Sequence, residues 1–436
     1  MKIFVTGLCT LHWGRLQYGN IGNYYIIEPL FRELHRVFPN DEIVTTFQMT
    51  EEYSRTEKIT VLPMEWYYAW NEHDLTLAKN EYAQATKLEA GVDAERTPYM
   101  QTVLESSVVI NVSGDMWGDN AEHVGKDRFE VDLYKMRTAQ LLGTRTVLFA
   151  GTPGPFHTCN DIDFAKEVYR NFDLVINREP TSTHNLEKWN FKSDNVKDFA
   201  CPAFLYKPEL TMQEVHSLNE LFDNLGADKK IVGFTIGGFN LPIGPYDMWP
   251  REEWQYEVFV EAIEHTMSKY NCKVVLISHT NGFELPPNFK LINGRDYPIL
   301  KQLKEIIVKR GIINSEDIVL LNGPYLPKMT KTIIGRFDMM ITGRVHASVA
   351  AISQLIPTVF INYEGSFIPS TKMYGFADLA GVGQLVCEPK EKEKLISNID
   401  FCMEHLDNIH NTLAKSIPVI KQKAHDAFDE IQKLCG

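Results

Sequence analysis

The sequence of 436 residues lacks any apolar run that approaches the roughly 20 residues needed to cross a bilayer. Its first residues, MKIFVTGLCT, turn polar too soon for a signal peptide, and we expect them to form a buried strand. We therefore expect a cytoplasmic protein with no transmembrane segment, which at most touches the inner face of the membrane peripherally.

Basic residues are also scarce, since 44 Lys and Arg face 57 Asp and Glu and give a net charge of −13. That balance argues against a nucleic-acid partner. The seven cysteines are an odd number, are scattered and form no CxxC pair, which argues against disulfides and zinc sites. GxGxxG, HExxH and nucleophile-elbow motifs are missing too. We therefore expect no metal and no cofactor.

What the sequence does contain is short apolar runs separated by helical patterns, in two sets. In the first half the expected strands are Lys2–Thr6, Glu42–Thr46, Ser107–Val112, Arg145–Ala150, Phe172–Ile176 and Val196–Phe199. In the second half they are Ile231–Ile236, Lys273–Ile277, Ile318–Leu321, Asp338–Thr342 and Thr358–Ile361. Such alternation is typical of parallel sheets covered by helices on both faces. We predict an α/β protein with two Rossmann-like doubly wound domains that face a cleft.

A polar helical stretch separates the two sets of strands and suggests where the domains end. We expect an N-terminal domain over residues 1–205, a helical linker over 206–230 and a C-terminal domain over 231–389. An amphipathic helical tail over 390–436 should pack back across the junction. Ligands of such sheets bind beyond the carboxyl ends of the strands, so the loops after strands matter most.

Two glycine-bearing loops follow strands of the first domain. Asn20 and Gly22 stand just before a helix, where small residues and free N–H groups suit a ligand; a plain helix cap is the alternative. Gly114 and Asp115 follow Ser107–Val112, and an acid there can bind a sugar hydroxyl. The neighbouring Trp117 can stack on a sugar, or can simply be buried under a turn.

His157 and Arg178 follow two further strands of this domain. His157 is either a site residue or a surface loop residue. Arg178, at a strand end before a helix, can fork onto a carboxylate or a phosphate. Its alternative is an ion pair with Glu179.

The most informative loop follows Asp338–Thr342 and reads Gly343-Arg344-Val345-His346. Arg and His are costly at the end of an apolar strand unless they meet a ligand or a buried partner. An anion-binding Arg344 beside a titratable His346 offers charge stabilisation together with general acid or base catalysis. A buried Arg–His–carboxylate network is the alternative.

Taken in order, these loops resemble those of the polysaccharide pyruvyl transferase family. The family's GNxGD element is similar to residues 19–23, its SGGG loop to 113–115, and its GxGIGPF element to 151–156. Its R(D/E)xxS, DPAF and TxRxH elements are similar to residues 178–182, 201–204 and 342–346. A later K…G resembles Lys372 and Gly375.

The resemblance implies a GT-B-like arrangement and the transfer of pyruvate from phosphoenolpyruvate to two hydroxyls of a sugar, which forms a cyclic ketal. Arg344 and Arg178 would hold the donor's carboxylate and phosphate. His346 would protonate the methylene carbon, and the ligand's two anionic groups would favour its protonated form. His157 would orient or deprotonate an acceptor hydroxyl. The acceptor would be a sugar, an oligosaccharide or a lipid-linked sugar on its way to a cell-surface polysaccharide.

Two alternatives stay open. A GT-B-like glycosyltransferase would use the same cleft, with Arg344 on the diphosphate of a nucleotide sugar. A non-catalytic sugar-binding relative is suggested by the altered glycine loop, where Asp115 stands in place of a glycine of the family.

Overall fold

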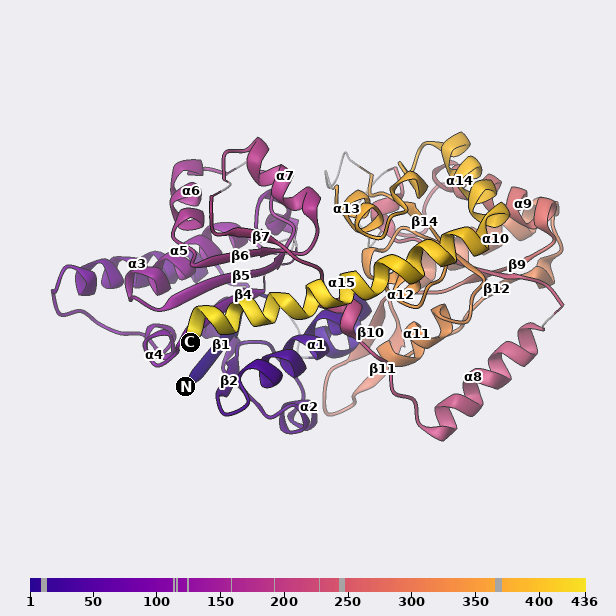
Figure 1. Cartoon of the computed structure of the whole chain (residues 1–436). Coiled ribbons are helices and arrows are strands. Elements are labelled where there is room, and N and C mark those ends of the chain that lie inside the picture. The colour runs from indigo at the N-terminus through magenta and orange to yellow at the C-terminus, as the bar shows by residue number, and fades with distance from the viewer. Residues whose placement is uncertain are drawn as a thin grey trace. The chain divides into compact units, whose positions relative to one another are not determined.

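The computed structural model describes residues 1–8, 14–112, 114, 117–123, 125–157, 159–191, 193–226, 228–242, 248–364 and 371–436. Contacts divide the chain into two compact units. Unit 1 comprises Met1–Leu16, Ile27–Pro202 and Gln422–Gly436, and unit 2 comprises Gln17–Ile26 and Ala203–Lys421. Each unit is built around one parallel sheet with helices beside it (Figure 1).

The sheet of unit 1 has seven parallel strands in the order β3-β2-β1-β4-β5-β6-β7. Its strands are β1 (Lys2–Thr6), β2 (Glu42–Thr45), β3 (Ile59–Val61), β4 (Val108–Val112), β5 (Arg145–Gly151), β6 (Leu174–Asn177) and β7 (Val196–Asp198). Strand β4, VVINV, is buried along its whole length, as a central parallel strand must be. The short strand β3 was not predicted, because Ile59–Val61 is only partly buried and carries little apolar pattern.

Helices lie beside this sheet, and several of them begin at a capping residue or a proline that the sequence shows. They are α1 (Ile21–Val37), α2 (Glu51–Thr56), α3 (Asp74–Glu89), α4 (Pro98–Leu104), α5 (Arg128–Leu141), α6 (Ile162–Arg170) and α7 (Pro180–Lys188). Thr97 caps α4 and Asp161 caps α6 by accepting a backbone N–H with the side chain. Helices α4 and α7 both have proline in their first turn, where its missing N–H costs nothing.

The sheet of unit 2 has six parallel strands in the order β12-β9-β8-β13-β14-β15. They are β8 (Ile231–Thr235), β9 (Lys273–Leu276), β12 (Ile318–Leu320), β13 (Met339–Thr342), β14 (Thr358–Ile361) and β15 (Val386–Cys387). An antiparallel hairpin, β10 (Asn281–Glu284) and β11 (Lys290–Asn293), was not predicted. The helices are α8 (Met212–Leu225), α9 (Glu257–Tyr270), α10 (Asp296–Arg310), α11 (Pro327–Ile334), α12 (Val345–Ile352), α13 (Lys372–Leu379), α14 (Lys392–Glu404) and α15 (Leu406–Cys435).

In both sheets the first strand of the unit lies in the interior, and the chain adds strands first on one side and then on the other. This doubly wound topology is the predicted fold class. The order of the strands reverses between β1 and β4 in unit 1, and between β8 and β13 in unit 2. Ligands of doubly wound sheets bind beside such a reversal, at the carboxyl ends of the strands.

Two helices contribute residues to both units, because the division between the units falls within α1 and within α15. The first turn of α1 belongs to unit 2, where Gly22 lies against His346. The last turns of α15 belong to unit 1, where the Phe428 ring lies 5.0 Å from that of Phe149. In the part of the chain that is described, no helix is both long and apolar enough to span a membrane.

Candidate functional site

The Arg344–His346 loop stands at the strand reversal of unit 2. It follows β13, directly beside the loop that follows β8. The hydroxyl of Thr342 accepts a hydrogen bond of 3.0 Å from the Arg344 backbone N–H and turns the chain at the end of the strand. Arg344 is the N-cap residue of α12, and His346 is the second residue of that helix. Both side chains therefore start at the edge of the sheet where ligands bind.

Asn240 ties this loop to its neighbours. Its Oδ1 accepts the Gly237 N–H at 2.9 Å, and its Nδ2 donates to the carbonyls of Gly343 at 3.2 Å and Asn362 at 3.0 Å. The side chain is 1% exposed, so leaving these groups unpaired would be costly. A Cβ on Gly343 would come within 2.3 Å of the Asn240 amide, which explains the glycine at this position.

The guanidinium of Arg344 pairs with Asp296, the first residue of α10. Its Nε lies 3.1 Å from Asp296 Oδ2, and its Nη2 bonds to Oδ1, which makes the pair bidentate. Asp296 is fully buried and the Arg344 side chain is 13% exposed. A Cβ on Gly237 would fall 2.7 Å from Arg344 Nη2, so the backbone of the β8 loop also approaches the guanidinium closely. The sequence left a buried Arg–His–carboxylate network open as an alternative, and the arginine–carboxylate part of that network is present. The ion pair fixes the orientation of Arg344.

His346 lies against the first turn of α1. A Cβ on Gly22 would come within 2.6 Å of the His346 ring, so only glycine allows this approach. The Asn20 side chain accepts the Gly22 N–H at 3.1 Å and so caps α1, which is the alternative role that the sequence suggested for this loop. The same loop thus caps a helix and brings its backbone next to His346. The Phe376 ring, 6.5 Å away, flanks the imidazole.

Lys372 belongs to the same unit and begins α13. Its side chain is 4% exposed, and its ammonium lies 4.5 Å from the centre of the Tyr363 ring. Tyr363 follows β14, and the Phe239 carbonyl of the β8 loop accepts the next backbone N–H, that of Glu364, at 2.7 Å. Through Tyr363, Lys372 therefore contacts the same group of loops as Arg344.

Three buried polar residues of this region were not predicted: Asn240, Asp296 and His279. His279 follows β9 and is 3% exposed. Burial, followed by the nearby charges of Arg344 and His346, holds the pKa of His279 well below its ordinary value. A signal did exist, because both residues lie in loops that follow predicted strands, Asn240 after Ile231–Ile236 and His279 after Lys273–Ile277.

Arg178 of unit 1 is also buried, with 3% exposure, and its Nε donates to the Thr152 hydroxyl at 2.7 Å. Thr152 lies in the loop after β5, so the ends of β5 and β6 are joined through this pair. The adjacent Glu179 caps α7, where its carboxylate accepts the Ser182 N–H at 3.2 Å. Burial raises the pKa of Glu179, against opposing contributions from Ser182 and Arg178.

The structure places the other predicted residues of unit 1 in different surroundings. His157 is exposed; its backbone N–H donates to Asp119 at 2.7 Å, and its ring lies 4.7 Å from that of Trp189. The Gly114 carbonyl accepts the Thr152 N–H at 2.8 Å, and its φ of +53° favours glycine. Asp115 lies outside the described residues. Trp117 is fully buried and donates to Asn111 at 3.2 Å, which agrees with a structural tryptophan under a turn.

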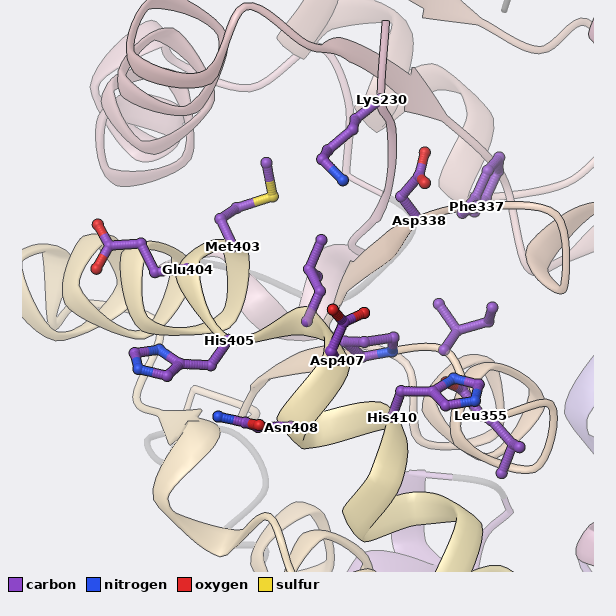
Figure 2. A pocket seen from close by; sticks show the side chains of 13 residues that line it. Lys230, Phe337, Asp338, Leu355, Met403, Glu404, His405, Asp407, Asn408 and His410 are labelled. Carbon is purple, nitrogen blue, oxygen red and sulfur yellow. The ribbon is translucent and has the colours of Figure 1, made fainter.

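A separate cavity of about 550 Å³ lies at the opposite edge of the sheet in unit 2 (Figure 2). Lys230 and Asp338, which line it, precede β8 and β13, so the cavity faces the amino ends of the strands. Asp407 and His410, from the start of α15, line it as well. It is therefore distinct from the Arg344–His346 region. Within the described ranges, no three His, Cys, Asp or Glu side chains are grouped so as to hold a metal ion.

Comparison with known proteins gives one family and one fold. The family model described as polysaccharide pyruvyl transferase matches residues 20–365. A search of curated proteins finds none that matches this sequence.

Several solved structures resemble the whole chain, each at 12% identity. The glycosyltransferase from Rickettsia africae ESF-5 has a TM-score of 0.58 over 100% of this chain and 98% of its own. Anabaena HepE in complex with UDP has a TM-score of 0.57 over 99% and 98%. UDP-GlcNAc 2-epimerase from Neisseria meningitidis, bound to UDP-GlcNAc, has a TM-score of 0.54 over 99% and 100%. At this identity the likeness establishes the GT-B-like fold alone.

Proposed function

The chain belongs to the polysaccharide pyruvyl transferase family, and from this premise we propose that it moves pyruvate from phosphoenolpyruvate onto two hydroxyls of a sugar, forming a cyclic ketal. The sugar would be part of a cell-surface polysaccharide or of its precursor, either free or lipid-linked. The donor acts as a substrate, and we propose that the reaction needs no metal and no cofactor. Phosphoenolpyruvate is made in the cytoplasm, where we propose that the enzyme acts.

The observation that carries this proposal is the placement of Arg344 and His346 together at the strand reversal of unit 2. Asp296 holds the guanidinium by a bidentate pair, so Arg344 is oriented before any ligand arrives. His346 lies two residues later, in the first turn of α12. A fixed cation beside a proton-carrying imidazole suits a small anion that must be protonated on carbon.

The proposed chemistry assigns one step to each group. His346 delivers a proton to the methylene carbon, and the adjacent carbon becomes an oxocarbenium ion. The first sugar hydroxyl adds to that carbon, and inorganic phosphate then leaves. The second hydroxyl adds and closes the ketal. Of the two hydroxyl protons, one goes to the departing phosphate, and the other restores to His346 the proton that it gave to the new methyl group. Arg344 stabilises the donor's negative charge throughout.

Unit 1 would bind the acceptor. Loops after β4 and β5 carry Gly114 and His157, and we propose that these loops, together with Asp115, contact the sugar hydroxyls. The buried Arg178 would be a second cation for the donor. Lys372, attached to the loops of unit 2, would add positive charge near Arg344.

A glycosyltransferase that uses a nucleotide sugar is the second candidate, because a glycosyltransferase and a UDP-bound protein share the fold. A non-catalytic sugar-binding relative is the third.

Thermal unfolding with phosphoenolpyruvate, UDP or CDP separates these candidates, since a ligand that binds the folded state raises its stability. We expect a rise in Tm with phosphoenolpyruvate for the wild type and none for R344A. A rise with a nucleotide alone would favour the glycosyltransferase. A rise with phosphoenolpyruvate but no turnover on any acceptor would favour the non-catalytic relative.

A further inference from the structure

His279 is a buried histidine to which the proposed reaction gives no role. It follows β9 at the carboxyl edge of the sheet in unit 2 and is 3% exposed. Its Nε2 is buried and has no hydrogen-bond partner within the part of the chain that the structure describes. A buried polar atom without a partner is uncommon in a folded protein, so it needs an explanation.

The backbone of His279 is bound to the carboxylate that holds Arg344. Asp296 Oδ2 accepts the His279 N–H at 3.2 Å and the Arg344 Nε–H at 3.1 Å. One oxygen therefore fixes both residues. Because Asp296 is itself fully buried, it holds the His279 backbone and the Arg344 guanidinium beside one another on the buried side of the site.

Helix α1 places His279 next to His346 as well. Gly22 lies against the His346 ring, and Tyr25, three residues later, makes an edge contact with the His279 ring at 5.5 Å. Residues three apart in a helix lie on one face. One face of the first turns of α1 thus contacts both histidines.

A neutral His279 suits this position. Burial and the charges of Arg344 and His346 lower its pKa, so it adds no positive charge beside the proton-carrying His346. Neutral imidazole has one N–H donor and one acceptor nitrogen. When Nε2 carries the proton, it can donate to an anion without exchanging a proton with it.

We propose that His279 is a further binding residue of the donor site, whose Nε2 donates a hydrogen bond to an anionic oxygen of the bound donor. The assignment rests on the proposed function, which supplies the anion. His279 then acts in binding, whereas His346 carries the proton.

Three variants test this assignment by their affinity for phosphoenolpyruvate in titration calorimetry. H279F keeps an aromatic ring to contact Tyr25, although a slightly larger one, and removes Nε2. H279N returns an amide at the position of Nδ1, and H279Q returns one at the position of Nε2. A hydrogen bond to a charged group corresponds to about tenfold to a hundredfold in affinity. We expect H279F and H279N to lose that much, and H279Q to retain most of the wild-type affinity.

The Tm of each variant without ligand is the control for folding. If H279F is too unstable to measure, the comparison of H279Q with H279N decides, since both carry the same amide group. Wild-type affinity in both H279F and H279N would overturn the assignment of His279 alone. Equal loss in H279Q and H279N, at unchanged Tm, would also overturn it. If phosphoenolpyruvate does not bind to the wild type, the proposed function fails first.

Discussion

Removing Asp296 should expose how strongly the site depends on one buried ion pair. Asp296 is fully buried and Arg344 is 13% exposed, so D296A leaves a nearly buried guanidinium without its carboxylate. Breaking a buried pair from one side costs about 3–5 kcal/mol. Because Arg344 keeps some contact with water, we expect the lower end, about 3 kcal/mol in the free energy of unfolding.

A double-mutant cycle measures this coupling without counting the other bonds of each residue. We would determine the free energy of unfolding in urea for the wild type, D296A, R344A and the double variant. Once one of the two residues has been replaced, replacing the other should lower the free energy of unfolding by about 2–3 kcal/mol less than it does in the wild type. The reason is that the first substitution has already broken the ion pair.

The exposed pair of Lys309 and Glu253 in the same unit provides a matched control. Its N–O distance is 2.8 Å, but the side chains are 72% and 60% exposed. We expect a coupling below about 1 kcal/mol there. If the effects of D296A and R344A are additive to within about 0.5 kcal/mol, the pair does not organise the site and our reasoning about Arg344 is wrong.

Three further predictions follow from the same group of loops. G22A should lower the rate of transfer about 100-fold with little change in Tm, because its Cβ would displace the His346 ring; wild-type turnover would contradict this. N240A should lower the free energy of unfolding by about 3 kcal/mol, since it removes three buried hydrogen bonds; a loss under 1 kcal/mol would contradict it. As the pH falls below 6.5, the ordinary pKa of histidine, the free energy of unfolding should decrease by up to about 1.4 kcal/mol more per pH unit in the wild type than in H279Q. The reason is that the unfolded wild-type chain takes up a proton that buried His279 does not. Urea unfolding at several pH values measures that difference, and parallel curves for the two proteins would refute it.

The fold could be predicted from the sequence where strands are apolar along their whole length. Val108–Val112 and Met339–Thr342 are buried throughout, and a continuous apolar run is the signature of a central parallel strand. The elements that were missed have no such run. Ile59–Val61 is an edge strand, and the exposed hairpin Asn281–Asn293 mixes Asn, Gly, Glu and Lys with apolar residues.

The sequence could predict only those residues of the candidate site that lie in loops after predicted strands. That rule found Arg344 and His346 together, because they share one loop. It missed Asp296, which lies 48 residues earlier and meets Arg344 only through the sheet. It also grouped Gly22 with the N-terminal domain, since nothing in the local sequence shows that the first turn of α1 contacts His346.

Transfer carried out in D₂O tests the central claim most directly. The purified protein would be incubated with phosphoenolpyruvate and a panel of saccharides, and products would be analysed by mass spectrometry and by phosphate release. Our account predicts a pyruvylated sugar, one phosphate per ketal and one deuterium in each new methyl group, with all three lost in H346A. A product that gains a sugar unit from a nucleotide sugar, and forms without phosphoenolpyruvate, would contradict it.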